Sequence, residues 1–420
     1  MRRSLVLLAL FGSLSLSAAE LSVDQRLAGL ATVWSEVKFN FANFDLVPKL
    51  EWDAEFAAYI PGVRAAKNDT EYYRLLQELV AKLHDGHTYL WPPAEMQAHW
   101  YATPRLTTEL IEGKVIVTGM YDPAGGVSVG DELLAIDGVP VRDYAETRVR
   151  PYIFSSTPQD SDNRTYRWLL LGGDDGSRVK LAFRDAGEKT LTRTNESFGP
   201  PKPLVSLRVL EGNVGLLTVN SFNDDQLRGR YDELWRQVEK TDALIIDIRG
   251  NGGGDTSNGR HILKTLTDKP FQESRWRTRM YLPVNRAWNE PAQWEQHEGK
   301  FQRPDGKRHY AKPVAVLIGP RTFSAAEDFA VAFDAMERGI FVGMPTGGST
   351  GQPLLITLPG AGILGICTKR DQYPDGREFV GVGVQPDIVV ATTVEDVRKG
   401  RDPVLERALA ALTASASSPR

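Results

Sequence analysis

The chain has 420 residues and a formal net charge of −4, with 41% hydrophobic and 25% charged residues. These values are typical of an ordinary globular protein of two or three domains. Phosphate binding requires clustered lysine and arginine, and no long basic block is present, so nucleic acid is excluded as the main partner.

The first 19 residues have the pattern of a secretory signal peptide. Arg2 and Arg3 form a positive start, residues 5–16 are a short apolar run, and residues 17–19 are small. The alternative is a membrane anchor, but this apolar run is too short to span a bilayer. We therefore expect export, with the Gram-negative periplasm favoured over secretion, and no stable membrane insertion.

Residues 20–100 are expected to form an N-terminal helical domain. Apolar residues recur at helical spacing from Leu27 to Trp34 and from Tyr72 to Leu83. The second run leads to His84, expected on the helix, and His87. Two histidines could belong to a metal site, but no third ligand stands out and the H-E-x-x-H pattern is absent. We expect neither a metal nor another cofactor.

Residues 104–196 change to short strands and turns. The Asp137-Gly138 pair predicts a hairpin between two apolar strands. Residues 129–138, Val-Gly-Asp-Glu-Leu-Leu-Ala-Ile-Asp-Gly, resemble part of a PDZ domain. PDZ domains bind peptide C-termini by adding a strand to a sheet edge. The alternative is a structural insert without a ligand; peptide binding is favoured.

Residues 202–412 are expected to form an α/β core. Apolar runs predict strands at 213–219, 243–248, 314–318 and 340–343, with helices at 225–240 and 325–338 between them. The single cysteine, Cys367, cannot form an internal disulfide and is expected to be a small buried hydrophobe. The Ala/Ser-rich residues 413–420 are expected to be a disordered tail.

Two of these strands end in loops suited to chemistry. Residues 250–254 hold four glycines in five positions, so backbone N–H groups can converge on a ligand. A flexible connector is one alternative; a phosphate loop is another, but its Gly-Lys-Ser/Thr ending is missing. Ser324 follows the next strand and Gly319-Pro320. Alone it is best interpreted as a helix N-cap, but beside a glycine-rich loop it becomes a candidate nucleophile.

Three motifs, in order, carry a resemblance: residues 247–254 (Asp-Ile-Arg-Gly-Asn-Gly-Gly-Gly), 323–327 (Phe-Ser-Ala-Ala-Glu) and 381–387 (Gly-Val-Gly-Val-Gln-Pro-Asp). Together they resemble the C-terminal-processing and tricorn-core serine peptidases. The resemblance implies a crotonase-like catalytic core with an N-terminal helical segment and an inserted PDZ-like domain. It also implies cleavage of peptides or proteins through an acyl-enzyme on Ser324. The rivals are a non-catalytic peptide- or apolar-ligand-binding protein on the same fold, and an adaptor that works only through its PDZ-like domain.

The two branches of this family imply different general bases. The C-terminal-processing branch uses a lysine in a loop after the serine, but Ser349 stands at that place, and the nearest lysine after Ser324 is Lys369. The tricorn-like branch uses a histidine from the N-terminal part, and His87 matches it. We therefore expect His87 to be the base.

The histidine branch also implies a serine directly before the base and a glutamate near the C-terminal motif. Gly86 replaces that serine, so the relay cannot exist in that form. Glu378 is the tentative third catalytic residue and Asp85 its alternative; for both, an exposed turn carboxylate is the plain interpretation.

The oxyanion hole is assigned to backbone N–H groups. The resemblance and the glycine-rich loop together imply the N–H of Ala325 with that of Gly252 or Gly253. Glu327 and Asp328 are interpreted as charges favoured in the first turn of a helix. Asp247 and Arg249 are expected to hold the loop by ion pairing.

Overall fold

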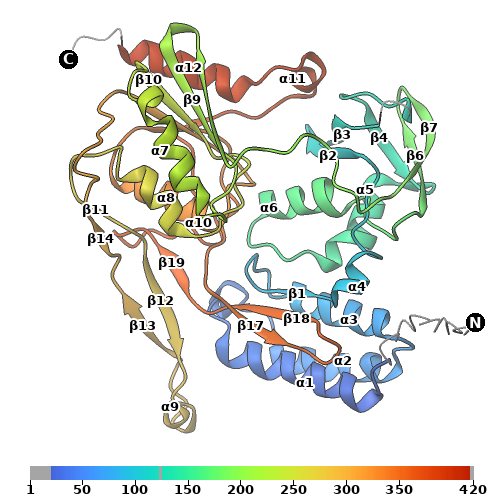
Figure 1. Ribbon diagram of the computed structural model, residues 1–420. Coiled ribbons are helices and arrows are strands. Elements are labelled where there is room, and N and C mark those ends of the chain that lie inside the picture. The colour runs from blue at the N-terminus through green and yellow to red at the C-terminus, as the bar shows by residue number, and fades with distance from the viewer. Residues whose placement is uncertain (1–19, 123–124, 417–420) are drawn as a thin grey trace, which may run out of the picture.

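The computed structural model describes residues 20–122 and 125–416 (Figure 1). The expected signal peptide, residues 1–19, lies outside the described residues, as do residues 417–420. Within the described part, no helix is both long and apolar enough to cross a membrane.

The N-terminal region is a helical layer, as expected. It contains α1 (Val23–Asn40), α2 (Trp52–Ala65), α3 (Asp69–Ala81) and the short α4 (Ala94–Gln97). Ser22 caps α1 by accepting a hydrogen bond from the Gln25 N–H. The expectation that His84 lies on the helix is wrong. The chain leaves α3 in a tight turn, in which the His84 N–H donates to the Ala81 carbonyl, and His84 itself has a φ of 47°.

A mainly antiparallel sheet follows, with strand order β2-β3-β4-β6-β7 and β5 paired to β4. The predicted hairpin at Asp137-Gly138 is confirmed, because Ile136 pairs with Val139 and both turn residues have positive φ. The strands are β2 (Leu106–Ile111), β3 (Lys114–Met120), β4 (Glu132–Ile136), β5 (Val139–Pro140), β6 (Arg178–Phe183) and β7 (Gly187–Thr192). Helical segments join β5 to β6: α5 (Val141–Tyr144), η3 (Ala145–Val149), η4 (Arg150–Tyr152), α6 (Pro158–Asn163) and η5 (Arg164–Leu169).

The core is a six-stranded sheet of order β20-β16-β15-β10-β9-β8, parallel except for β8. The expected core strands are confirmed in β9 (Val214–Val219), β10 (Ala243–Asp247), β15 (Val314–Ile318) and β16 (Ile340–Gly343). The edge strands are β8 (Val205–Leu210) and β20 (Ile388–Val389).

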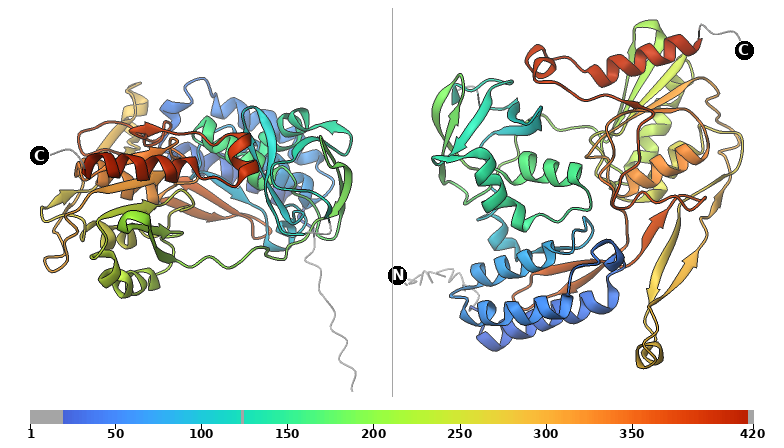
Figure 2. Two further views of the ribbon diagram at one scale, coloured as in Figure 1. Left: turned by 90° about the horizontal axis from the view of Figure 1, so that it is seen from above. Right: turned by 180° about the vertical axis from the view of Figure 1, so that it is seen from behind.

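Helices cover both faces of this sheet (Figure 2). Leu244 and Ile246 of β10 pack with α7 (Gln226–Val238), α8 (Thr256–Leu263) and α10 (Ala325–Ala335). Ile245 points to the opposite face and packs with α12 (Pro403–Ala416), as strand alternation requires. A short α11 (Val394–Lys399) precedes α12. The expected disorder from residue 413 differs from the structure, because α12 continues to Ala416 through strongly helix-forming alanines.

An extension projects from the core (Figure 1). It is built by β12 (Arg275–Met280), α9 (Pro283–Ala287) and β13 (Gln293–His297), with β19 (Arg370–Gln372) paired along β12. The short strands β11 (Phe271–Gln272) and β14 (Phe301–Gln302) pair at its base.

One strand pairing joins the N-terminal region to the C-terminal part of the chain. β17 (Pro353–Thr357) and β18 (Ile363–Cys367) leave the core as an antiparallel pair, and the other side of β18 pairs with β1 (Tyr89–Trp91), with Leu90 opposite Leu364. The pairing crosses the expected boundary between the helical domain and the core. It fixes the segment just before β1, which carries His87, beside the C-terminal half of the chain.

Candidate active site

Ser324 is the N-cap residue of α10, at the end of the turn that follows β15. Its backbone has φ 57° and ψ −128°, a conformation that costs a non-glycine residue about 1–3 kcal/mol. Two hydrogen bonds just before it hold the turn: Thr322 Oγ1 donates to the Ile248 carbonyl, and the Phe323 N–H donates to the Asn251 carbonyl. In this turn the Ser324 hydroxyl lies within hydrogen-bond distance of His87.

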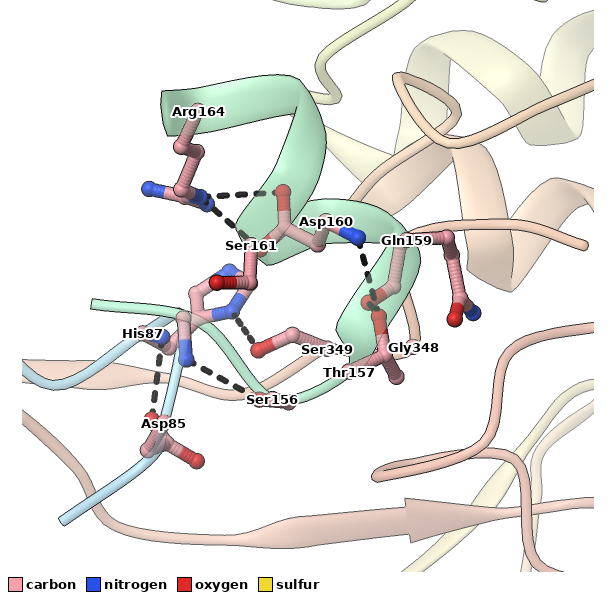
Figure 3. Close-up of polar contacts among 12 residues, drawn as sticks. Asp85, His87, Ser156, Thr157, Gln159, Asp160, Ser161, Arg164, Gly348 and Ser349 are labelled. Atoms are coloured by element: carbon pink, nitrogen blue, oxygen red, sulfur yellow. Dashed lines mark hydrogen bonds and ion pairs between the residues drawn. The ribbon is translucent and has the colours of Figure 1, made fainter. Parts of the chain in front are cut away.

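His87 contacts two serines through its two ring nitrogens. Nε2 lies 3.0 Å from Ser324 Oγ, and Nδ1 lies 2.9 Å from Ser349 Oγ. The imidazole stacks on the Phe323 ring with centroids 4.8 Å apart and planes 3° apart. The His87 N–H donates to Asp85 Oδ1 at 2.9 Å, which fixes the backbone beneath the ring. Figure 3 shows His87 between the Asp85 segment and Ser349.

Burial decides the charge of this histidine. His87 is only 7% exposed, and burial, followed by the nearby cations Arg164 and Lys369, lowers its pKa to about 3. The ring is therefore neutral at pH 7. If Nδ1 carries the proton and donates to Ser349 Oγ, Nε2 is free to accept a proton from Ser324.

Glu327 anchors the loop that carries Ser349. Its buried carboxyl group accepts hydrogen bonds from the Gly348 N–H at 2.7 Å, the Ser349 N–H at 2.9 Å and the Ser324 N–H at 3.3 Å. Thr346 Oγ1 donates a fourth bond at 2.5 Å. Burial raises the pKa of Glu327 to about 8, and the donors oppose that rise. Glu327 thus ties the start of α10 to residues 346–349, a role that the interpretation as a helix-start charge missed.

Ser349 occupies the space that a side chain at residue 86 would need. A Cβ added to Gly86 would lie 2.9 Å from the Phe323 ring and 3.0 Å from Ser349 Oγ. The serine expected directly before the histidine is thus absent, and a serine from a distant loop contacts the imidazole instead. One signal in the sequence pointed to this residue: Ser349 stands at the place where the resemblance implied a lysine.

The glycine-rich loop packs directly against Ser324. A Cβ on Gly253 would lie 2.7 Å from both the Phe323 carbonyl oxygen and Ser324 Cβ, and its φ of +98° also favours glycine. The Gly253 N–H already donates to Asn251 Oδ1 at 2.9 Å. Across residues 20–122 and 125–416, the N–H groups of Gly252 and Ala325 have no protein acceptor. Of the two glycines, Gly252 therefore has the N–H that is free to bind an oxyanion.

The structure does not bring Glu378 to His87. Its carboxylate accepts hydrogen bonds from Arg370 Nε at 3.1 Å and Gln372 Nε2 at 2.7 Å, so it belongs to the region around β19. The alternative, Asp85, is buried, and burial raises its pKa. It contacts the backbone of His87 rather than the ring, so neither carboxylate orients the imidazole.

Lys369 forms an ion pair with Asp371 and does not contact the catalytic candidates. Its Nζ lies 2.6 Å from Asp371 Oδ1. Burial opposes its charged form, but the carboxylates of Asp371 and Asp328 raise its pKa overall. A lysine that is held charged cannot accept a proton from Ser324.

The expected ion pairs around the loop are confirmed. The Arg249 guanidinium donates to Asp247 at 2.7 Å and also to Asp402 at 2.8 Å, just before α12. Cys367 is buried, as expected, and the described residues hold no group of three or more histidine, cysteine, aspartate or glutamate side chains placed to bind a metal.

Comparison with known proteins gives a consistent family. Residues 213–390 match the family described as Peptidase family S41. The chain is 25% identical over 336 residues to carboxyl-terminal-processing peptidase 2, chloroplastic, of Arabidopsis thaliana; the match covers 76% of this chain but only 60% of the relative. It is 23% identical over 395 residues to a tricorn protease homolog of Streptomyces coelicolor, covering 86% of this chain and 30% of the relative. The crystal structure of mature CPAF has the same fold, with a TM-score of 0.74, 17% identity, and coverage of 94% of this chain and 99% of that one.

Proposed function

Because this chain is a serine-type peptidase whose residues 213–390 form a peptidase family S41 domain, we propose that it cleaves peptide bonds with Ser324 as nucleophile and His87 as general base. The observation that carries the proposal is the contact of His87 with Ser324 on one ring nitrogen and with Ser349 on the other. A serine hydroxyl becomes nucleophilic when a base takes its proton, and the base acts best when its second nitrogen is held.

Acylation begins with proton transfer. His87 Nε2 accepts the Ser324 proton while Ser324 Oγ bonds to the carbonyl carbon of the scissile peptide. The negative charge that develops on the carbonyl oxygen is bound by the N–H groups of Ala325 and Gly252. The imidazolium then gives its proton to the departing amine, and the C–N bond breaks to leave an ester on Ser324.

Deacylation repeats these steps with water. His87 removes a proton from the water that attacks the ester, the same N–H groups bind the oxyanion, and the proton returns to Ser324 as the acid product leaves. In both steps Ser349 Oγ accepts a hydrogen bond from His87 Nδ1–H and so keeps Nε2 directed at Ser324. Ser349 and Glu327 are positioning residues in this scheme.

Active-site labelling tests the assignment. A fluorophosphonate probe should label the wild-type protein, and peptide mass spectrometry should locate the adduct on Ser324. Labelling should be lost in Ser324→Ala and strongly slowed in His87→Ala, because a serine without its base is a poor nucleophile.

The matched control for the base is His84→Asn. His84 has a positive φ, which asparagine tolerates, and the residue is not part of the proposed catalytic pair. Its labelling rate should stay at the wild-type value. A wild-type protein that is folded but does not label would support a non-catalytic binding protein on the same fold.

We further propose a crotonase-like core, a PDZ-like character for residues 104–196 and export of the chain. The first two rest on the sequence resemblance, and the last rests on the pattern of residues 1–19. Export is tested by expressing the full chain in a Gram-negative host and sequencing the N-terminus of the periplasmic product. It should begin at Glu20; an uncleaved product confined to the cytoplasm would contradict export.

A further inference from the structure

A pocket lined by aromatic side chains lies between the N-terminal helices and the β-rich domain. Trp91, Trp100, Tyr101, Tyr152 and Trp168 line it, and it encloses about 170 Å³. An apolar cavity of about 150 Å³ is large enough to bind benzene. The pocket can therefore take one aromatic ring, and its wall residues supply the ring faces and edges that aromatic pairs prefer.

All the charged side chains that line the pocket are positive. Arg74, Arg148 and Arg164 line the pocket, and none of its lining residues is acidic. Arg164 is neutralised by Asp160, which accepts from its Nε at 2.8 Å. In the described part of the chain, neither Arg74 nor Arg148 forms an ion pair with a carboxylate.

Arg74 is an unusual cation for a folded protein. Its guanidinium lies 4.0 Å from the centroid of the Trp100 ring and 4.8 Å from that of Tyr152, so it is packed against aromatic surface. Among the residues that the structure describes, Arg74 donates a side-chain hydrogen bond only to Gln77 Oε1, at a long 3.3 Å. Burial lowers the pKa of Arg74. A partly buried cation is stabilised by an anionic partner, and arginine offers carboxylates a planar set of donors.

The pocket is connected to the proposed catalytic pair. The guanidinium of Arg164, which lines the pocket, lies 5.0 Å from the centroid of the Phe323 ring. Phe323 stacks on His87 and directly precedes Ser324. Arg164 therefore lies between the pocket and the proposed catalytic pair, and a peptide at Ser324 that runs past Arg164 would reach the pocket.

We propose that this pocket is a substrate-binding subsite that takes an aromatic side chain together with a carboxylate, and that Arg74 binds the carboxylate. The proposal rests on the peptidase function proposed above. It differs from peptide binding at a sheet edge of the β-rich domain, because the pocket wall comes from α3, β1, the segment after α4 and the helical region from α5 to η5. The carboxylate could belong to the C-terminus of the peptide or to an acidic side chain, and the test separates these sources.

Binding is measured by calorimetry on Ser324→Ala protein that comprises residues 20–420 and cannot turn the peptides over. Four hexapeptides of one backbone sequence are compared: a free C-terminal phenylalanine, its amide, a free C-terminal alanine, and the phenylalanine amide with glutamate before it. The free phenylalanine peptide should bind about tenfold or more tightly than the alanine peptide and than the plain amide. Recovery of affinity in the glutamate peptide assigns the carboxylate to a side chain, and its absence assigns it to the C-terminus.

Two variants in the same background test the pocket itself. Arg74→Met should remove the preference for a carboxylate, and Trp168→Ala should weaken the preference for phenylalanine. Trp168 is 48% exposed, so its truncation spares the core and keeps the test valid if Arg74→Met misfolds. Arg236→Met, an exposed arginine on α7, is the matched control and should bind like the parent.

Two results would overturn the proposal: equal affinity for all four peptides, or preferences that survive in both pocket variants. Fluorophosphonate labelling of Arg74→Met with Ser324 restored keeps the two proposals apart. Labelling at Ser324 shows that the catalytic pair works whether or not the pocket binds peptide.

Discussion

At the scale of single residues, the charge state of His87 governs when the site can act. A general base works only when it is unprotonated, and burial with Arg164 and Lys369 lowers the pKa of His87 from 6.5 to about 3. The rate should therefore stay high as the pH falls below 6.5 and should decline only in more acidic solution.

This pH dependence is measured as kcat/KM from pH 2 to pH 9, a range that includes the lowered pKa of His87, with folding followed by circular dichroism. Because the pKa of His87 is lower in the folded than in the unfolded state, its stabilising contribution is complete above pH 6.5 and is lost as the pH falls towards the folded value. Lys369→Ala should keep the acidic limb but move it to higher pH, because a nearby cation is removed. A wild-type limb at or above pH 6.5 in folded protein would contradict the assigned environment of His87.

Ser349 is the second residue whose chemistry can be isolated. Ser349→Ala removes the acceptor 2.9 Å from Nδ1, so the ring is no longer held with Nε2 towards Ser324. We expect kcat to fall about 10- to 100-fold, the value of one hydrogen bond to a charged group, with little change in KM.

The control for Ser349 is Ser156→Ala. Ser156 Oγ accepts from the Gly86 N–H at 2.9 Å, so its removal disturbs the same segment without touching the imidazole. Equal losses of kcat in both variants would mean that Ser349 serves only the packing of the segment.

At the scale of elements, the start of α10 and the loop 346–349 act as one unit through Glu327. Each of its carboxyl oxygens accepts from two donors. In Glu327→Gln the amide nitrogen replaces one oxygen, and in either orientation at least one buried backbone N–H loses its acceptor. We expect a loss of about 1–3 kcal/mol in the free energy of unfolding and a fall in kcat.

Thermal unfolding and steady-state kinetics measure the two effects of Glu327→Gln. Asp328→Asn is the companion variant: Asp328 is the next residue on α10, and its carboxylate accepts from Thr256 Oγ1 rather than from the loop. If Glu327→Gln kept both the wild-type Tm and the wild-type kcat, the anchoring role of Glu327 would be wrong.

At the scale of the whole molecule, the site depends on the pairing of β1 with β18, which we call the seam and which joins distant parts of the chain. His87 precedes β1, and β1 is held by β18 through pairs such as Leu90 with Leu364. Leu364 is fully buried, so Leu364→Ala should destabilise the protein by about 2–5 kcal/mol. Because the loss falls on the seam, activity should drop although Leu364 is remote from Ser324 in sequence.

Hydrogen exchange distinguishes this effect from general loss of stability. Leu412→Ala truncates a buried leucine of α12 on the far face of the core sheet, so it serves as the matched control. The amides of residues 87–91 should exchange faster in Leu364→Ala than in Leu412→Ala. Equal exchange in both variants would show that the seam does not hold His87.

The sequence by itself determined the local elements and the candidate chemical groups. The four core strands, the helices between them, the Asp137-Gly138 hairpin and the burial of Cys367 depend on patterns within a few residues, which a sequence displays directly. Local patterns also place Ser324 and the glycine-rich loop after the ends of two strands. These segments then lie close together because parallel strands bring their carboxyl ends to one edge of the sheet.

The tertiary structure decided which residues meet. His87 and Ser349 are 262 positions apart in sequence, and they touch because the β17–β18 pair leaves the core and β18 pairs with β1. No local pattern encodes that crossing. For the same reason Glu378 could be named from its place near a motif, although its partners are Arg370 and Gln372 rather than His87. A side chain's neighbours across the fold depend on how whole elements pack, and that packing depends on the buried surface of the entire chain.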